Sequence, residues 1–397
     1  MSRPVLLLDI SRLVRRFEYF GGPTGIDRVD FQYARWLLRQ ELFEPMPVAM
    51  GRSGLFAIPL PAAEKIFGEL ERRWHADAPP GFGREDRSAL RFYGERLVSR
   101  IARWRVLAGA HRPKLDGRRA VYLNVSQDGL DLPQNYAGLP CAKVALIHDV
   151  IPLTHPEYDT PRLVDLHRRR IEAVAAHFDH VIGISEATVD ALSAAAGPKK
   201  YGTTIVPLAP ALTTADEPMQ FDRPTFVHLS TINRRKNAAL ILHVFRELAA
   251  HGEPPHLALV GRRGNDTTAV ELIDRCPALQ RVTTVYGALN DQEAAPILAG
   301  ARALLTPSFA EGFGLPIVEA HAMGVPVVAS DIPAHREVGG DGALYVSPLD
   351  GNGWRDAILS LARDEERAAA LRSAIPRPRT WDDHFAVVGP LLADQAR

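Results

Sequence analysis

Two glutamates, Glu311 and Glu319, stand eight residues apart, with two glycines and a proline between them. An apolar run precedes the pair, so the order of residues predicts a strand, a turn and a helix. Proline is favoured at the first helical position, where its missing N–H has no helical partner to bond. The helix is therefore expected to begin near Leu315 or Pro316 and to end at Gly324.

This arrangement suits a ligand that carries both phosphate and hydroxyl groups. A helix N-terminus presents backbone N–H groups and the positive end of the helix dipole to an anion. Gly312 and Gly314 allow that anion to come close to the backbone. Glu311, in the loop, and Glu319, about one turn inside the helix, flank the anion as hydroxyl acceptors would for a sugar and a ribose. The alternative is an ordinary amphipathic helix with two solvated glutamates.

The run from Glu311 to Glu319 and the segment 323–330 that follows resemble the donor site of one enzyme family. The family is the retaining glycosyltransferases of the GT-B fold, glycosyltransferase family four. The resemblance implies an α/β protein in which two doubly wound, Rossmann-like domains face each other across a cleft. It also implies that Glu311 positions the transferred hexose, that Glu319 holds the ribose, and that the donor is lined by Gly312, Phe313, Gly314 and Leu315.

Segment 226–242 resembles the family's strand, Arg-Lys-Asn turn and helix. Arg235 and Lys236 stand where the family neutralises the donor diphosphate, and two cations beside a helix N-terminus make a sensible anion clamp. A solvated basic turn is the alternative. The segment departs from the family pattern at Leu229, Ser230, Asn233 and Arg234. The resemblance therefore assigns no role to Asn233.

Three further pieces resemble segments of the same family. Gly287 ends a segment that borders the nucleobase in the family. Gly22 and Gly25 lie in a glycine loop, expected between the first strand and a helix, that faces the diphosphate. His148 ends a predicted buried strand, and the carboxyl ends of parallel strands are where α/β proteins bind ligands. The resemblance places His148 beside the transferred sugar, whereas a lone histidine is more often structural.

Composition narrows the class of protein. The chain has 397 residues, 46% of them hydrophobic and 24% charged, which is enough for two domains. Its 47 basic and 47 acidic residues cancel, so nucleic acid is not an expected partner. Its two cysteines lack neighbours at metal-ligand spacing and are expected to be reduced thiols of a cytoplasmic protein. The apolar run at the N-terminus is too short for a signal peptide and is predicted to be a strand.

Short apolar runs alternate with helical patterns along the whole chain, which is typical of doubly wound α/β domains. The expected domains are an acceptor-binding domain over 1–207, a linker over 208–224, a nucleotide-sugar domain over 225–375, and a helix over 376–397 that returns to the first domain. Strands are predicted at 5–9, 120–124, 143–148, 180–184, 204–207, 225–230, 256–261, 282–286, 303–306, 325–329 and 343–346.

Segment 84–119 carries 11 basic and 4 acidic residues with apolar residues interleaved at helical spacing. Such a helix is able to lie on an anionic membrane at the inner face of the plasma membrane. Packing on the acceptor domain with a solvated basic face is the equally weighted alternative.

Taken with the resemblance, these residues predict a retaining glycosyltransferase that needs neither a metal nor a bound cofactor. It would move a hexose from a nucleoside-diphosphate sugar to a glycan or polyprenyl-linked acceptor in cell-surface polysaccharide assembly. The sequence has no Asp-x-Asp motif, so Arg235 and Lys236 are expected to stabilise the leaving diphosphate. The resemblance implies that His148 and Glu311, which position the sugar, complete the catalytic set. The first-domain segments look most like bacterial mannosyltransferases, which favours GDP-mannose over UDP-sugars.

Three other functions stay open. A sugar-nucleotide epimerase of the same architecture would turn over the donor without an acceptor. A catalytically inactive relative would bind the sugar nucleotide only. A dinucleotide-dependent dehydrogenase would need a third glycine after Gly312 and Gly314, where the chain has Ile317.

Overall fold

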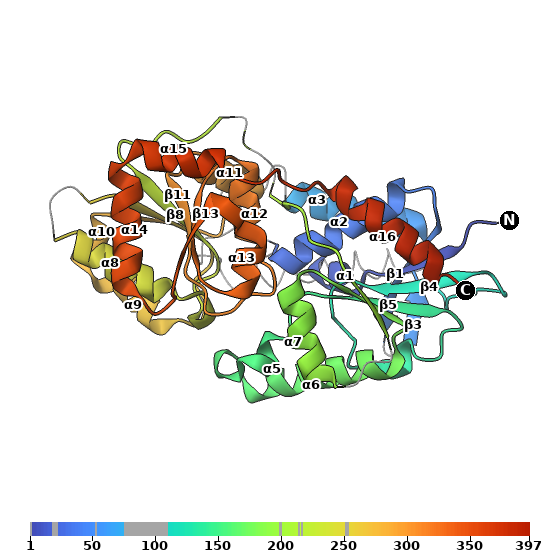
Figure 1. The fold of residues 1–397 in the computed structure, drawn as a ribbon. Helices are drawn as coiled ribbons and strands as arrows, with labels where there is room; N and C mark the ends of the chain where they lie inside the picture. Colours follow the sequence, from blue (N-terminus) through green and yellow to red (C-terminus); the bar gives the residue numbers. More distant parts are fainter. Residues whose placement is uncertain are drawn as a thin grey trace, which may run out of the picture. The chain divides into compact units, whose positions relative to one another are not determined.

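The computed structural model of the chain describes residues 2–17, 23–51, 54–74, 110–197, 201–212, 215, 217–250 and 254–397. These residues form two compact units (Figure 1). The first unit comprises the described residues up to Leu208 together with Thr380–Arg397, and the second comprises Ala209–Arg379. Each unit is built on one largely parallel β-sheet.

Within its described residues, the sheet of the first unit has seven strands in the order β3-β2-β1-β4-β5-β6-β7. All neighbours pair in parallel except β2 and β3, which form an antiparallel hairpin. The strands are β1 Val5–Asp9, β2 Glu44–Gly51, β3 Gly54–Ala57, β4 Ala120–Asn124, β5 Ala142–Ile147, β6 His180–Gly183 and β7 Gly202–Ile205. The helices are α1 Ser11–Phe17, α2 Gly25–Arg39, α3 Leu60–Trp74, α5 Ile151–Thr154, α6 Pro161–His177, α7 Glu186–Ala196 and α16 Trp381–Gln395.

Helix α16 joins the first unit although it follows the second unit in the sequence (Figure 1). Phe385 stacks on Trp36 of α2, with ring centroids 4.8 Å apart. His384 contacts the hydroxyl of Tyr33 at 2.8 Å and the carbonyl of Pro207 at 2.9 Å. Aromatic stacking and the two polar contacts of His384 thus fix α16 to the first unit, against α2 and Pro207.

The second unit has a six-stranded parallel sheet in its described residues, in the order β10-β9-β8-β11-β12-β13. Its strands are β8 Thr225–Leu229, β9 His256–Val260, β10 Thr283–Gly287, β11 Ala303–Thr306, β12 Val327–Ser330 and β13 Ala343–Val346. Its helices are α8 Ala238–Leu248, α9 Thr267–Arg275, α10 Pro277–Gln280, α11 Asp291–Ala299, α12 Leu315–Ala322, α13 Pro333–Gly339, α14 Gly351–Arg363 and α15 Glu365–Ser373.

Alternation along the strands explains why this sheet is covered on both faces. Leu257 and Leu259 of β9 enter one apolar cluster with residues of α8 and α14, whereas Ala258 and Val260 enter another with residues of α11 and α12. Side chains on successive strand residues point to opposite faces, so a run that is apolar throughout must be buried on both.

All eleven predicted strands are present, with ends displaced by no more than two residues. The elements of the first unit that were not placed from the sequence are the strands β2 and β3 and the helices α1, α3, α5 and α6. Because α1 follows β1, the glycine loop does not come directly after the first strand as expected. Helix α12 begins at Leu315 as predicted and ends at Ala322, two residues before the predicted end.

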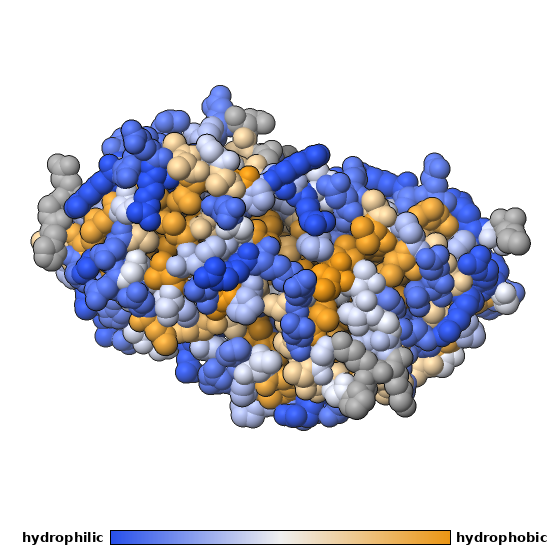
Figure 2. Space-filling model, in the orientation of Figure 1, coloured by the Kyte–Doolittle hydropathy of each residue, from blue (hydrophilic) through white to orange (hydrophobic). Residues whose placement is uncertain are grey.

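The surface mixes both kinds of side chain. On the face in Figure 2, hydrophobic residues lie among hydrophilic ones, and the most exposed large apolar side chain among the described residues is Leu349, at 80%. Across the part of the chain that the structure describes, we find no helix with the length and apolar character needed to span a bilayer.

Candidate functional site

The predicted donor-site residues of the second unit lie at the topological switch point of its sheet, where the strand order reverses. From β8 the chain adds β9 and β10 on one side, and then β11, β12 and β13 on the other. Ligands of open α/β sheets bind outside the carboxyl ends of the strands at such a switch point. The turn after β8 carries Arg235 and Lys236, and the loop after β11 carries Glu311.

Glu311 holds both cations. Its Oε2 lies 2.8 Å from Nη1 of Arg235, and its Oε1 is in direct contact with Nζ of Lys236. The side chain of Glu311 is 9% exposed, and those of Arg235 and Lys236 are 22% and 16% exposed. The three side chains therefore form a partly buried cluster that carries one net positive charge.

The cations fix the protonation state of Glu311. Burial alone would raise the pKa of this carboxyl group, but the charges of Arg235 and Lys236 hold it well below its usual range. Glu311 is consequently ionised near pH 7. An ionised carboxylate acts only as a hydrogen-bond acceptor, as a partner of a sugar hydroxyl must.

Backbone contacts fasten the basic turn to the glutamate loop. The amide of Phe309 donates to the carbonyl of Arg235 at 2.9 Å. Asn237, in the left-handed conformation at φ 55°, donates its side-chain amide to the carbonyl of Pro307 at 3.2 Å. Asn233, which had no assigned role, caps the turn by accepting from the amide of Lys236 at 3.0 Å. These hydrogen bonds fix the turn of residues 233–237, and with it the two cations, against the loop after β11.

The N-terminus of α12 completes the site. Gly314 precedes it at φ 115°, a conformation that favours glycine, and no side chain caps the helix there. The first backbone N–H groups of such a helix favour an anionic ligand. Phe313 is buried, and Glu319 lies inside the helix at 5% exposure. The structure thus gathers Glu311, Gly312, Phe313, Gly314, Leu315 and Glu319 around one helix start.

Two histidines near this cluster were not predicted. His335 of α13 is fully buried beside Gly314, where an added Cβ would come within 3.4 Å of its ring. Its Nδ1 lies 3.1 Å from the carbonyl of Ser330, and its Nε2 has no hydrogen-bond partner among the described residues. His228 of β8 lies between the carbonyl of Leu305 and the hydroxyl of Ser230, each at 2.9 Å.

Burial dominates the titration of both rings. It lowers the pKa of His335 and that of His228 to about 4, against smaller opposing effects from Glu311 and from backbone hydrogen bonds. Both rings are neutral near pH 7. His228 lies in segment 226–242, which resembles the family, but no role was assigned to it, and His335 lies in no motif that was recognised in the sequence.

Gly287 ends β10 at φ 72°, with open space where a Cβ would be. Its carbonyl accepts from the amide of Gly261 at 2.8 Å. Strand β10 is separated from β8 only by β9. Gly287 therefore lies at the same edge of the sheet as the cation turn, two strands away.

The remaining predicted residues belong to the first unit. His148 follows β5 at 5% exposure, and its Nε2 lies 2.8 Å from the carbonyl of Val125. Because a carbonyl only accepts, Nε2 carries the proton of the neutral ring; burial lowers the pKa of His148 to about 4. Gly25 is the first residue of α2, after the capping residue Thr24. Gly22 lies outside the described residues, as does most of segment 84–119.

No group of three or more His, Cys, Asp or Glu side chains able to hold a metal ion occurs within the described ranges. The charge at the candidate site is instead supplied by Arg235 and Lys236, in contact with Glu311.

Solved structures of other proteins share this arrangement of two units, each built on a largely parallel sheet. The chain resembles sucrose-phosphate synthase from Thermosynechococcus elongatus with a TM-score of 0.61 and 16% identity, covering 98% of each chain. It resembles Anabaena Alr3699/HepE, solved with UDP and glucose, with a TM-score of 0.64 and 16% identity, covering 98% of this chain and 99% of that one. At this identity the likeness establishes the fold, which is GT-B.

Residues 223–364 match the family of glycosyl transferases group 1. The switch-point site lies within the residues that match this family. Among sequence relatives, the serotype-specific mannosyltransferase WbdA of Escherichia coli is 24% identical over 68% of this chain and 36% of its own length. The O-antigen chain mannosyltransferase B of E. coli is 32% identical over 40% of this chain and 42% of its own length.

The MMP alpha-(1->4)-mannosyltransferase of Mycolicibacterium hassiacum is 51% identical over 29% of this chain and 28% of its own length. This chain thus spans about a third of the length of the relatives named WbdA. The sequence resemblance to bacterial mannosyltransferases is confirmed.

Proposed function

We propose that the chain is a retaining glycosyltransferase that moves mannose from a nucleoside-diphosphate sugar to a glycan or lipid-linked acceptor. The observation that carries the proposal is the contact of Glu311 with both Arg235 and Lys236 beside the N-terminus of α12. That arrangement pairs a diphosphate clamp with an acceptor for sugar hydroxyls within the residues that match the glycosyl transferases group 1. The names of the relatives support mannose as the sugar.

In the proposed reaction, the bond between the sugar's anomeric carbon and the diphosphate breaks as the acceptor oxygen bonds to the same face of that carbon. Negative charge then grows on the leaving diphosphate. Arg235, Lys236 and the backbone N–H groups at the start of α12 stabilise this charge, and a preorganised set of donors does so without rearranging at the moment of reaction. These two cations are the reason we propose that transfer needs no metal ion.

The acceptor hydroxyl loses its proton to an oxygen of the leaving diphosphate. Glu311 is ionised and accepts hydrogen bonds from the hexose, which fixes the sugar against the clamp. Glu319 accepts from the ribose. His148 is neutral with its proton on Nε2, so its Nδ1 is the nitrogen able to accept a hydrogen bond from the sugar.

Donor profiling tests the proposal. Melting temperatures are measured with GDP, UDP and ADP and with their mannose and glucose derivatives, and the products formed with α-mannoside acceptors are then identified by NMR. We expect GDP and GDP-mannose to give the largest shifts and the new linkage to keep the α configuration of the donor. EDTA should leave the rate unchanged.

Several outcomes would overturn parts of the proposal. A β-linked product would contradict retention. Loss of transfer in EDTA with recovery in Mg²⁺ or Mn²⁺ would contradict metal independence. Conversion of the donor to another sugar nucleotide without an acceptor would indicate an epimerase, and nucleotide binding without any turnover would indicate an inactive relative.

A further inference from the structure

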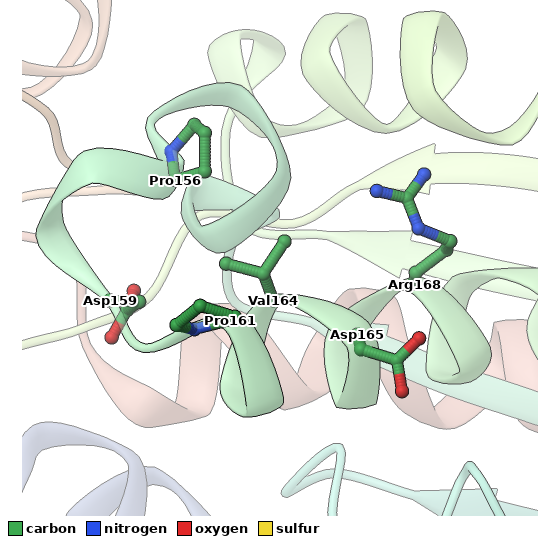
Figure 3. Close-up of a pocket in the computed structure, with 6 residues that line it drawn as sticks. All are labelled: Pro156, Asp159, Pro161, Val164, Asp165 and Arg168. Carbon is green, nitrogen blue, oxygen red and sulfur yellow. The ribbon is translucent and has the colours of Figure 1, made fainter.

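A pocket of about 310 Å³ lies in the first unit, between the helical turn η2 (Pro156–Tyr158) and the start of α6. Its lining is shown in Figure 3 and consists of Pro156, Asp159, Pro161, Val164, Asp165 and Arg168. The volume is at the lower end of the range for small-molecule sites. It belongs to neither the second sheet nor the cation cluster described above.

The lining combines two kinds of surface. Pro156, Pro161 and Val164 supply apolar walls, while Asp159 and Asp165 lie on opposite sides of Pro161 and Val164 in Figure 3. A hexose has the matching chemistry, because its C–H groups contact apolar walls and its hydroxyls donate to carboxylates. A binding site for a large apolar molecule would not have three charged side chains in its wall.

The charges favour a neutral polyol over an ion. Asp165 is paired with Arg169, one turn further along α6. Asp159, Asp165 and Arg168 leave the lining with one net negative charge, which disfavours a phosphate. The two carboxylates do not form part of a metal-binding group among the described residues.

Local hydrogen bonds form the pocket before any ligand arrives. The amide of Asp159 donates to the carbonyl of Pro156 at 3.2 Å, which closes the η2 turn. Thr160 then caps α6 by accepting from the amide of Leu163 at 3.4 Å. The rings of His155 and Tyr158 stack at 6.2 Å beside Pro156. A preformed pocket of this kind loses little entropy on binding.

The pocket is close to His148 along the chain. Helix α5 and η2 lead from Asp149 to Pro156, and Asp149 Oδ1 fixes the start of α5 by accepting from the amide of Ile151 at 3.1 Å. Burial is the main cause of the lowered pKa of His167 on α6, and the charges of Asp149 and Asp159 oppose this effect. The first residue of the pocket lining, Pro156, thus follows His148 by eight residues in the sequence.

We propose that this pocket binds one hexose unit of the acceptor glycan, a proposal that rests on the proposed transferase function. A subsite here would hold a sugar unit of the acceptor beside the segment that begins at His148. It would contribute to the affinity for the acceptor and leave the donor site unaffected.

The test compares a filled pocket with a matched control on the full chain. Val164→Trp fills the pocket, and Glu172→Trp places the same side chain on an exposed position of α6 outside it. Saturation-transfer NMR measures the binding of the methyl α-glycosides of mannose, glucose and galactose. We expect Val164→Trp to raise the Kd of the preferred glycoside at least tenfold and Glu172→Trp to change it less than twofold.

A second variant guards against misfolding. Asp159→Asn keeps the shape of the pocket and should raise the same Kd about threefold to tenfold. Equal binding by the wild type and by both pocket variants, or no binding of any of the three glycosides by the wild type, would overturn the subsite. GDP affinity, measured on every variant by calorimetry, separates the two proposals. If the wild type binds no nucleotide, the transferase proposal fails, whereas the loss of glycoside binding in the pocket variants still reports on the subsite.

Discussion

Oε2 of Glu311 lies 2.8 Å from Nη1 of Arg235, and the other oxygen of the same carboxylate contacts Lys236. The carboxylate predicted to hold the sugar and the cations predicted to hold the diphosphate are therefore direct partners. A diphosphate that binds these cations brings its charge next to Glu311. The two positive charges exceed the charge of the carboxylate by one, and this net positive charge is available to the ligand.

Glu311→Ala should destabilise the protein and respond strongly to nucleotide. Removing the carboxylate leaves two partly buried cations unpaired, which costs about 3 kcal/mol when one partner of a buried pair is lost. A nucleoside diphosphate replaces the missing charge, so the shift in melting temperature with GDP should be larger in the variant than in the wild type. Transfer should nevertheless be severely reduced, because the lost contact is with the reacting sugar. Thermal melts with and without GDP, together with rates, measure both effects.

Lys236→Ala should lower turnover by about ten- to a thousandfold, because it removes a charged contact that strengthens as the diphosphate leaves. Arg246→Ala, at an exposed position of α8, removes a positive charge from the same unit and should change turnover little. Both are measured as kcat at saturating donor. A folded Lys236→Ala protein with normal turnover would mean that the leaving group is stabilised elsewhere.

Glu319→Ala should weaken binding of bare GDP by about 1 to 3 kcal/mol, the usual cost of losing a hydrogen bond to a charged group. The loss should appear equally with GDP and with GDP-mannose, because the ribose is common to both. Calorimetry on Glu319→Ala and Glu311→Ala makes the comparison. Equal loss of GDP affinity in the two variants would contradict the separate roles proposed for the two glutamates.

His228→Gln should reduce the sensitivity of stability to acid. Burial lowers the pKa of His228 from 6.5 to about 4, so the unfolded chain takes up a proton before the folded protein does. The stability that depends on its neutral form is complete above pH 6.5 and is lost as the pH falls toward 4, by about 3 kcal/mol in total. Glutamine keeps hydrogen-bonding groups but does not titrate.

Urea unfolding at pH 5, 6 and 7 provides the measurement for this prediction. The wild type should lose more unfolding free energy between pH 7 and pH 5 than His228→Gln does. His155→Gln, at a half-buried histidine of the other unit, controls for the replacement of a histidine by glutamine as such. Identical slopes for His228→Gln and the wild type would contradict the lowered pKa.

Strands buried on both faces could be predicted because each is a short, continuous apolar run, as in β4 and β12. Strand β2 was missed because Pro45 and Pro47 are unusual in a strand with neighbours on both sides. The register explains how they are accommodated. Strand β3 pairs with Val48–Gly51, beyond the two prolines, and on that side Pro47 only accepts, through its carbonyl, from the amide of Ile58 at 2.8 Å. Only pairing, which is not local in sequence, reveals this.

The candidate site was predictable where chemistry and spacing coincide. Glu311, Arg235 and Lys236 were each found from their own segment, but nothing local shows that they touch across 75 residues of sequence. His335 was missed because its part in the site depends on the packing of α13 against Gly314. The sequence alone therefore predicted which residues belong to the site, but it did not predict which segments contact one another there.

The path of the chain through α16 also has a consequence for biosynthesis. The backbone of Arg397 exchanges hydrogen bonds with Ala120 at the start of β4, at 3.1 and 3.3 Å, and α16 packs against α2. The second unit is synthesised before these residues, so it can fold on the ribosome while the first unit still lacks its last helix. All the strands of the first unit are synthesised before the second unit, but the first unit is completed only when α16 has been made. Until α16 has been made, the aromatic face around Tyr33 and Trp36 that it covers is exposed, and transiently exposed apolar surface is prone to aggregation.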